Sequence, residues 1–175
     1  AHVVSNDYYV DYLLLDIPLQ RYFYTRIVTG HTSHHLSDNW YERLKYTSAF
    51  RYSRDYVKLF FIREVNCNDQ FYLGADYGYF VTIGQRMQKP WMFQTGGKYA
   101  FAELYGRIML YGAFDSKIRQ EGGFAATNTI QIGISIPMQY NRIVRLALQQ
   151  RNGLDERGQF FSRHRSISTV GISVE

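Results

Sequence analysis

The chain has 175 residues, a formal net charge of +5 and a single cysteine, Cys67. One cysteine excludes an internal disulfide and a cysteine-based metal cluster. The basic residues are spread singly, which argues against a nucleic-acid partner, and no apolar stretch approaches the ~20 residues of a membrane-spanning helix. Aromatic residues make up 17% of the chain, and 16 of them are Tyr, a composition that favours β-strands. We therefore expect one all-β domain over residues 1–175, without a cofactor or a metal ion.

Candidate strands follow one another along almost the whole chain. In the N-terminal half, apolar and aromatic runs predict strands at 8–16, 19–31, 43–52, 56–65 and 70–82. The C-terminal half adds runs at 91–100, 103–115, 128–136, 142–151 and 165–175. Alternation is clearest in 128–136, where isoleucines occupy one face and Gln131, Gly133 and Ser135 the other. These runs predict about ten strands and no helix.

The length of the runs bears on their surroundings. Several contain nine to thirteen residues, whereas strands of soluble proteins typically have about 5–6 and strands that cross a bilayer about 9–11. A membrane barrel carries apolar side chains outside and polar ones inside. A soluble lipocalin-like barrel reverses the two faces, and periodicity alone does not say which face is inside. We expect an antiparallel up-and-down transmembrane β-barrel.

Segments along most of the chain resemble one uncharacterised bacterial family. They are "GHTSHHLSDN" (30–39), "AFRYSRDYVKL" (49–59), "LYGAFDSK" (110–117) and "QQRNGLDERGQFFSRHRSISTVGISVE" (149–175). The family is catalogued as a domain of unknown function of outer-membrane β-barrel type, and its two best markers are the His-x-Ser-x-His stretch and the final "NG...GQFF" hairpin. Because its members are usually longer at the N-terminus, the resemblance implies that N-terminal strands are missing here and that the full protein has twelve.

What the resemblance implies about location and role is an expectation. It places the protein in the outer membrane of a Gram-negative envelope, in contact with membrane lipid, lipopolysaccharide and other outer-membrane proteins. It carries no established activity. We expect a porin-like protein that is a structural or narrow-pore subunit of an envelope assembly and not an enzyme. The alternative is a lipid ester hydrolase, of deacylase or phospholipase type.

If the apolar faces of the strands contact lipid, the opposite faces line a lumen that is basic. The residues opposite the apolar faces, and therefore expected to line the lumen, are Arg107, Arg145, Arg151, Arg163 and Arg165, partly neutralised by Asp115. Such a lumen favours anionic solutes. A network of arginines and carboxylates would instead plug a barrel of about ten strands.

The stretch "TGHTSHHLSDN" (29–39) is the candidate catalytic site. In a strand, His31, Ser33 and His35 share one face, so His31 can serve as a base for the Ser33 nucleophile, with Glu42 or Asp38 as the orienting acid. A His-x-Ser pair on a barrel strand resembles the active sites of outer-membrane phospholipases and lipid A deacylases, although those enzymes place asparagine after the serine.

Two other interpretations of this stretch stay open. These residues can simply form the polar end of a strand or line a polar lumen. A metal site formed by His31, His34, His35 and Asp38 is the weaker alternative, because the adjacent His34 and His35 point to opposite faces of a strand. His31 and His35 would then lie about 13 Å apart along it.

Overall fold

The computed structural model describes residues 5–36, 51–66, 69–83, 85–86, 89–105, 108–138, 142–155 and 163–174. These residues form one antiparallel sheet in which each long strand pairs with the next one along the chain. The nine long strands are β1 (Ser5–Gln20), β2 (Phe23–Leu36), β3 (Arg51–Asn66), β4 (Asp69–Ile83), β6 (Trp91–Glu103), β7 (Met109–Arg119), β8 (Ala125–Pro137), β9 (Ile143–Leu154) and β10 (His164–Val174). The two-residue β5 (Gln85–Arg86) pairs only with β4, and a 3-10 turn, η2 (Gln120–Gly122), separates β7 from β8. None of the described residues belongs to a helix long and apolar enough to cross a membrane.

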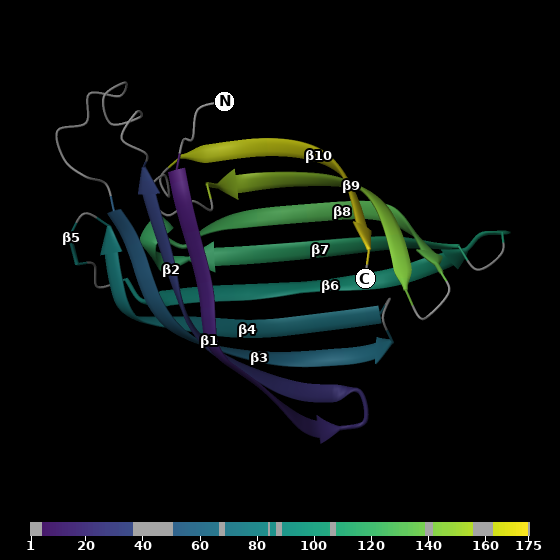
Figure 1. Ribbon diagram of the computed structural model, residues 1–175, viewed down its shortest axis with the longest axis horizontal. Coiled ribbons are helices and arrows are strands. Elements are labelled where there is room, and N and C mark those ends of the chain that lie inside the picture. Colours follow the sequence, from purple (N-terminus) through teal and green to yellow (C-terminus); the bar gives the residue numbers. More distant parts are fainter. Residues whose placement is uncertain are drawn as a thin grey trace.

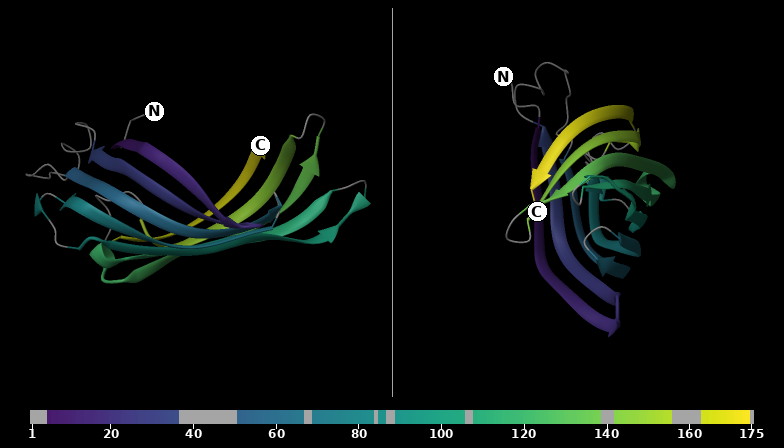
Figure 2. Two further views of the ribbon diagram at one scale, coloured as in Figure 1. Left: turned by 90° about the horizontal axis from the view of Figure 1, so that it is seen from below. Right: turned by 90° about the vertical axis from the view of Figure 1, so that its right-hand side faces the viewer.

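The all-β, up-and-down architecture predicted from the sequence is confirmed, but the sheet does not close. It curves into a trough whose open side lies between β1 and β10 (Figures 1 and 2). Each of these two strands has a single neighbour, β2 or β9. Successive long strands alternate in direction, and their number, nine, is odd. The first and the last of them, β1 and β10, therefore run in the same direction. The described strands therefore form an open sheet, where a closed barrel was expected.

Two predicted strands are divided differently in the structure. The run 19–31 is broken by a tight turn at Arg21 and Tyr22, between β1 and β2. Tyr22 has a φ of 73°, an uncommon value for an aromatic residue, and its carbonyl oxygen accepts a hydrogen bond from the Glu64 N–H (2.8 Å). The run 103–115 is likewise split, because β6 ends at Glu103 and β7 begins at Met109. The predicted strand 43–52 lies outside the described residues except for its last two, which begin β3.

The two faces of the trough differ in polarity. In β8, Ile130 and Ile132 are exposed on the convex face, whereas Thr129 and Gln131 line a pocket on the concave face. The same division runs through β3, where Tyr56 and Lys58 line the concave side and Leu59 is exposed on the other side. Strict alternation along a strand produces this division, and the curvature of the sheet decides that the apolar face is the convex one.

Glycine at position 30 permits two strands to approach on the concave face. A Cβ atom there would lie 2.5 Å from the Val10 carbonyl oxygen and 2.7 Å from the Tyr56 hydroxyl oxygen. That hydroxyl donates a hydrogen bond to Asp11 Oδ1 (2.8 Å). The tyrosine ring and the neighbouring backbone therefore fill the space that a side chain would need.

We expect Gly30→Ala to lower the free energy of unfolding by about 1–3 kcal/mol, the usual cost of inserting a methyl group into a filled site. Gly171→Ala in β10 is the matched control, because a Cβ there meets nothing within 4 Å, and its effect should stay below about 1 kcal/mol. Unfolding followed by circular dichroism in detergent micelles measures both. Equal losses in the two variants would contradict the close approach at Gly30.

Candidate functional site

Three of the polar residues singled out in the sequence lie together on the convex face. His31, Ser33 and His35 alternate along β2, and in the register of β2 with β3 His31 stands opposite Asp55. We call His31, Ser33, His35 and Asp55 the convex histidine patch. Residues of the other parity, Thr32 among them, line the concave pocket instead. The patch therefore shares its face with exposed apolar side chains of β1 and β3.

Two short hydrogen bonds organise the convex histidine patch. Ser33 Oγ lies 2.7 Å from His35 Nε2, and His31 Nδ1 lies 2.6 Å from Asp55 Oδ1. Because a carboxylate only accepts, His31 donates from Nδ1, which leaves its Nε2 as the basic nitrogen of the neutral ring. Ser33 is buried, whereas the side chains of His31 and Asp55 are 28% and 26% exposed.

The partners differ from those expected. His31 was expected to bond to Ser33, but the imidazole in contact with the serine is that of His35. The predicted orienting acids, Asp38 and Glu42, lie outside the described residues. Asp55 is an acid that the sequence analysis missed, because only the pairing of β2 with β3 brings it to His31 across 24 positions of the chain. One signal in the sequence could have identified Asp55: it is an acid on the same face of its strand as the apolar residues Val57 and Leu59.

His34 has a structural environment on the concave side. It is 1% exposed, its Nδ1 donates to Asp7 Oδ1 (2.8 Å), and its ring contacts those of Tyr9 and Tyr52, each at 5.3 Å between centroids. Within the described ranges, no group of three His, Cys, Asp or Glu side chains is placed to hold a metal ion. The histidine-rich stretch is thus divided between the two faces of the sheet.

A buried charged cluster fills part of the trough. Arg54 Nη2 donates to Asp76 Oδ1 (2.5 Å) and to the Pro90 carbonyl oxygen (2.6 Å). Glu121, from the η2 turn, reaches β3, where the Tyr52 hydroxyl donates to it (3.2 Å). Glu121 also lies 3.6 Å from a guanidinium nitrogen of each of two arginines, Arg54 and Arg119. This cluster joins β3 and β4 to the β7–β8 connection, and the sequence analysis did not single out Glu121.

The residues expected to line a lumen occupy several environments. Asp115 is on the concave face and accepts hydrogen bonds from the Tyr72 hydroxyl and the Gln94 amide, each at 2.5 Å. Arg145 is buried, with its guanidinium 5.7 Å from the centre of the Tyr111 ring, and Arg151 lines a concave pocket. Arg165 Nη1 lies 3.3 Å from Oδ2 of the buried Asp155, and Arg163 is exposed just before β10. Arg107 lies outside the described residues.

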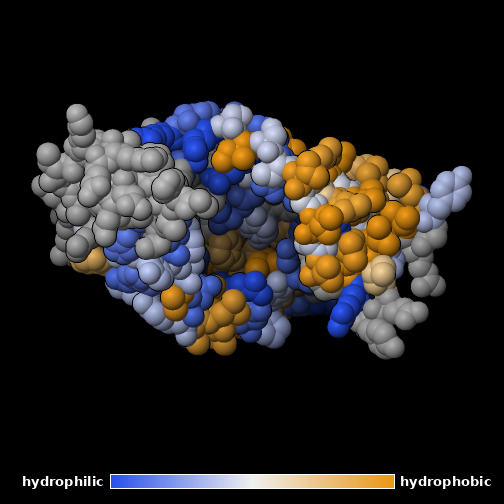
Figure 3. All heavy atoms as spheres, turned by 45° about the horizontal axis from the view of Figure 1, so that its top comes forward, coloured by the Kyte–Doolittle hydropathy of each residue, from blue (hydrophilic) through white to orange (hydrophobic). Residues whose placement is uncertain are grey.

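Exposed aromatic and aliphatic side chains share the convex face. Near one end of the strands, Trp91 packs against Tyr77 and Phe93, with ring centroids 5.0 and 6.0 Å away. Near the other end of β6, Tyr99 and Phe101 are exposed. Leu73 stands opposite Phe61, and Ile130 opposite Phe114. The exposed aliphatic residues of this face include Leu59, Leu73, Ile130, Ile132 and Leu148. Figure 3 shows the hollow of the trough, with hydrophilic residues and some hydrophobic ones, beside one strongly hydrophobic flank.

The described residues thus offer two distinct chemistries. The convex histidine patch has the groups needed for acyl transfer, a serine hydroxyl bonded to an imidazole and a second imidazole bonded to a carboxylate. The trough has buried charges and hydrogen-bond donors suited to polar solutes. The chain matches no protein-family model, no curated protein and no solved structure.

Proposed function

We propose that the chain forms the wall of a β-barrel in a bacterial outer membrane, as a structural or narrow-pore subunit of an envelope assembly. The observation that carries this proposal is the placement of apolar side chains on the convex face and polar ones in the trough. A soluble barrel has the opposite arrangement. The long strands have 11 to 16 residues, enough to cross a bilayer at a tilt, which takes about 9–11.

The connections support the same proposal. Outer-membrane barrels have short turns on the periplasmic side and longer loops outside. Here the connections at one end are 21–22, 67–68, 104–108 and 138–142, whereas those at the other are 37–50, 84–90, 120–124 and 155–163. The end with the longer connections is therefore assigned to the cell exterior. The convex histidine patch, near the end of β2, lies toward that side.

Closure of the sheet sets a condition on the proposed barrel. Because β1 and β10 run in the same direction, antiparallel closure takes an odd number of further strands between them. One further strand gives ten, and three give the twelve implied by the family resemblance. The charged cluster around Arg54 and Glu121 occupies one end of the interior, which favours a structural role or a narrow pore over an open channel.

The first test asks whether the chain needs detergent to fold. We expect the chain to give a β-sheet circular dichroism spectrum in detergent micelles and to precipitate when the detergent is removed, because its convex face would then meet water. Insertion into planar bilayers should give small conductance steps or none. A folded, monodisperse protein in detergent-free buffer would reject the membrane proposal.

The convex histidine patch favours a second function, the hydrolysis of an acyl ester of a membrane lipid. Ser33 lies on the convex side of β2, buried among its neighbours on a largely apolar face, with its Oγ bonded to an imidazole. In this reaction an imidazole takes the Ser33 proton while Oγ attacks the acyl carbonyl carbon. The same imidazole returns the proton to the departing alcohol oxygen, and water then releases the fatty acid from Ser33. An ester of lipid A or of a phospholipid in the outer leaflet fits this position.

A further inference from the structure

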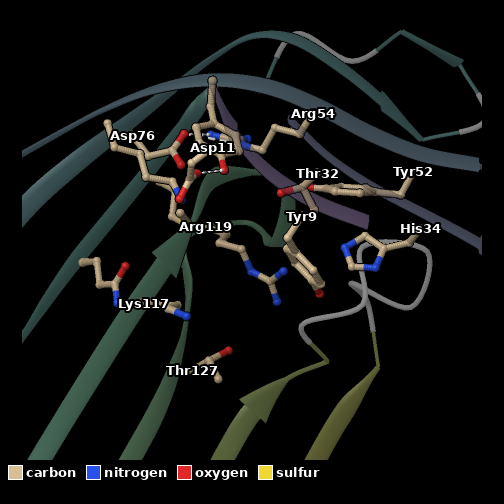
Figure 4. A pocket seen from close by; sticks show the side chains of 14 residues that line it. Tyr9, Asp11, Thr32, His34, Tyr52, Arg54, Asp76, Lys117, Arg119 and Thr127 are labelled. Carbon is tan, nitrogen blue, oxygen red and sulfur yellow. Dashed lines mark hydrogen bonds and ion pairs between the residues drawn. The ribbon is translucent and has the colours of Figure 1, made fainter. Parts of the chain in front are cut away.

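Basic side chains from two opposite strands meet in a pocket of the trough. This pocket, of about 280 Å³, takes Arg54 and Lys58 from β3 and Lys117 and Arg119 from β7. Figure 4 shows the Arg54 wall and the Lys117 and Arg119 wall on opposite sides of the pocket. Four cationic groups therefore surround a space that is at the lower end of the size range of small-molecule sites.

Three acids lie near these four cations, and two of them, Asp76 and Asp11, also attract Lys58. Asp76 accepts two hydrogen bonds from Arg54, and Glu121 lies within 3.6 Å of both Arg54 and Arg119. Asp11, the remaining acid of the lining, accepts from the Tyr56 hydroxyl. Lys58 Nζ lies 4.0 Å from the centre of the Tyr56 ring, a contact that leaves its positive charge in place. Even with Glu121 counted, four cations face three acids.

A second pocket, of about 390 Å³, adjoins the first and has the same excess of positive charge. Lys117 lines both pockets, and Lys98 and Arg151 line only the second. Its single acid, Asp115, accepts hydrogen bonds from Tyr72 and Gln94. The positive potential therefore extends along the concave face, with Lys117 at the junction of the two pockets.

We propose that the first pocket binds a small oxyanion, a phosphate or carboxylate group of a hydroxylated solute, between Lys58 and Lys117. An oxyanion there would accept charge-assisted hydrogen bonds from both lysines and reduce their mutual repulsion. Hydroxyl and amide groups of Tyr9, Thr32, Gln94 and Thr127 also line the pocket and can bind the rest of the solute. This inference rests on the proposed function, in which the trough is the interior that a solute enters.

Calorimetric titration of the full chain in detergent micelles tests the site, with inorganic phosphate and citrate as probes and spermidine as a cationic control. We expect at least one oxyanion to bind saturably and spermidine not to bind. Lys58→Ala and Lys117→Ala should each weaken oxyanion binding about tenfold or more, since a hydrogen bond to a charged group is lost. Lys58→Arg should retain most of the affinity. Lys89→Ala, which changes an exposed lysine outside both pockets, should leave it unchanged.

Two results would overturn the site. One is the absence of saturable binding of either oxyanion to a protein that shows its β-sheet spectrum. The other is an equal loss of affinity in Lys58→Ala and Lys89→Ala. A larger loss in Lys98→Ala than in Lys58→Ala would overturn the assignment to the first pocket, because Lys98 lines only the second. The membrane proposal fails separately, through folding without detergent, so the two failures are distinguishable.

Discussion

Replacing Arg54 by alanine should lower the free energy of unfolding by about 3–5 kcal/mol, the usual cost of removing one partner of a buried ion pair. Arg54 is 5% exposed and Asp76 is 2% exposed, so the Asp76 carboxylate would stay buried without its principal partner. Glu121 would lose one of its two nearby guanidinium groups as well. Denaturation in detergent micelles, followed by circular dichroism, measures the loss.

The Arg26–Asp16 pair is a matched control for Arg54. It has the same chemistry, with two hydrogen bonds of 2.7 and 2.8 Å, but its side chains are 34% and 40% exposed. Arg26→Ala should therefore cost less than about 1 kcal/mol, as exposed ion pairs usually do. If Arg54→Ala costs no more than Arg26→Ala, the charged cluster does not stabilise the trough.

Ser33→Ala should abolish ester hydrolysis if the convex histidine patch is catalytic, with a loss in kcat of at least about 10³-fold, because no other group replaces the nucleophile. Asp55→Asn should lower kcat by about 10²–10⁴-fold if His31 is the base and Asp55 holds its ring in the tautomer with a basic Nε2. The substrate is a long-chain p-nitrophenyl ester in mixed micelles. Mass spectrometry of lipid A from the host membrane gives a second readout.

Three further variants make this experiment decisive. Ser53→Ala is the matched control, because Ser53 stands opposite Ser33 on β3 and should leave kcat unchanged. His31→Ala and His35→Ala identify the base: the larger loss marks the imidazole that takes the serine proton. Hydrolysis that persists unchanged in Ser33→Ala, with lipid A acylation also unaltered, would reject the hydrolase and leave the patch as a polar strand end.

The amino-acid sequence by itself determined the class of secondary structure and the division of each strand into two faces. Alternation in 128–136 predicted one strand, and the structure extends it to β8 (Ala125–Pro137). The spacing of His31, Ser33 and His35 likewise put all three on one face, as the structure shows. Both results depend on the two-residue period of a β-strand, which is a local property of the chain.

Turn positions and long-range side-chain contacts were harder to predict from the sequence. The turn at Arg21 and Tyr22 contains none of the residues typical of turns, Gly, Pro, Asn or Asp. It forms because β2 pairs with β1 on one side and with β3 on the other. For the same reason the sequence offered no way to pair Asp55 with His31, or Glu121 with Tyr52 across 69 positions. Such contacts depend on strand register and on how far a turn folds inward.

Only the tertiary structure decided which face of the sheet is convex and whether the strands close. Periodicity distinguishes two faces but is unchanged when inside and outside are exchanged. The direction of curvature follows from how all nine long strands twist and pack together. That curvature puts the convex histidine patch outside and the lysines of β3 and β7 inside. Closure depends on what lies beside β1 and β10, and no local pattern in the chain specifies the partner of an edge strand.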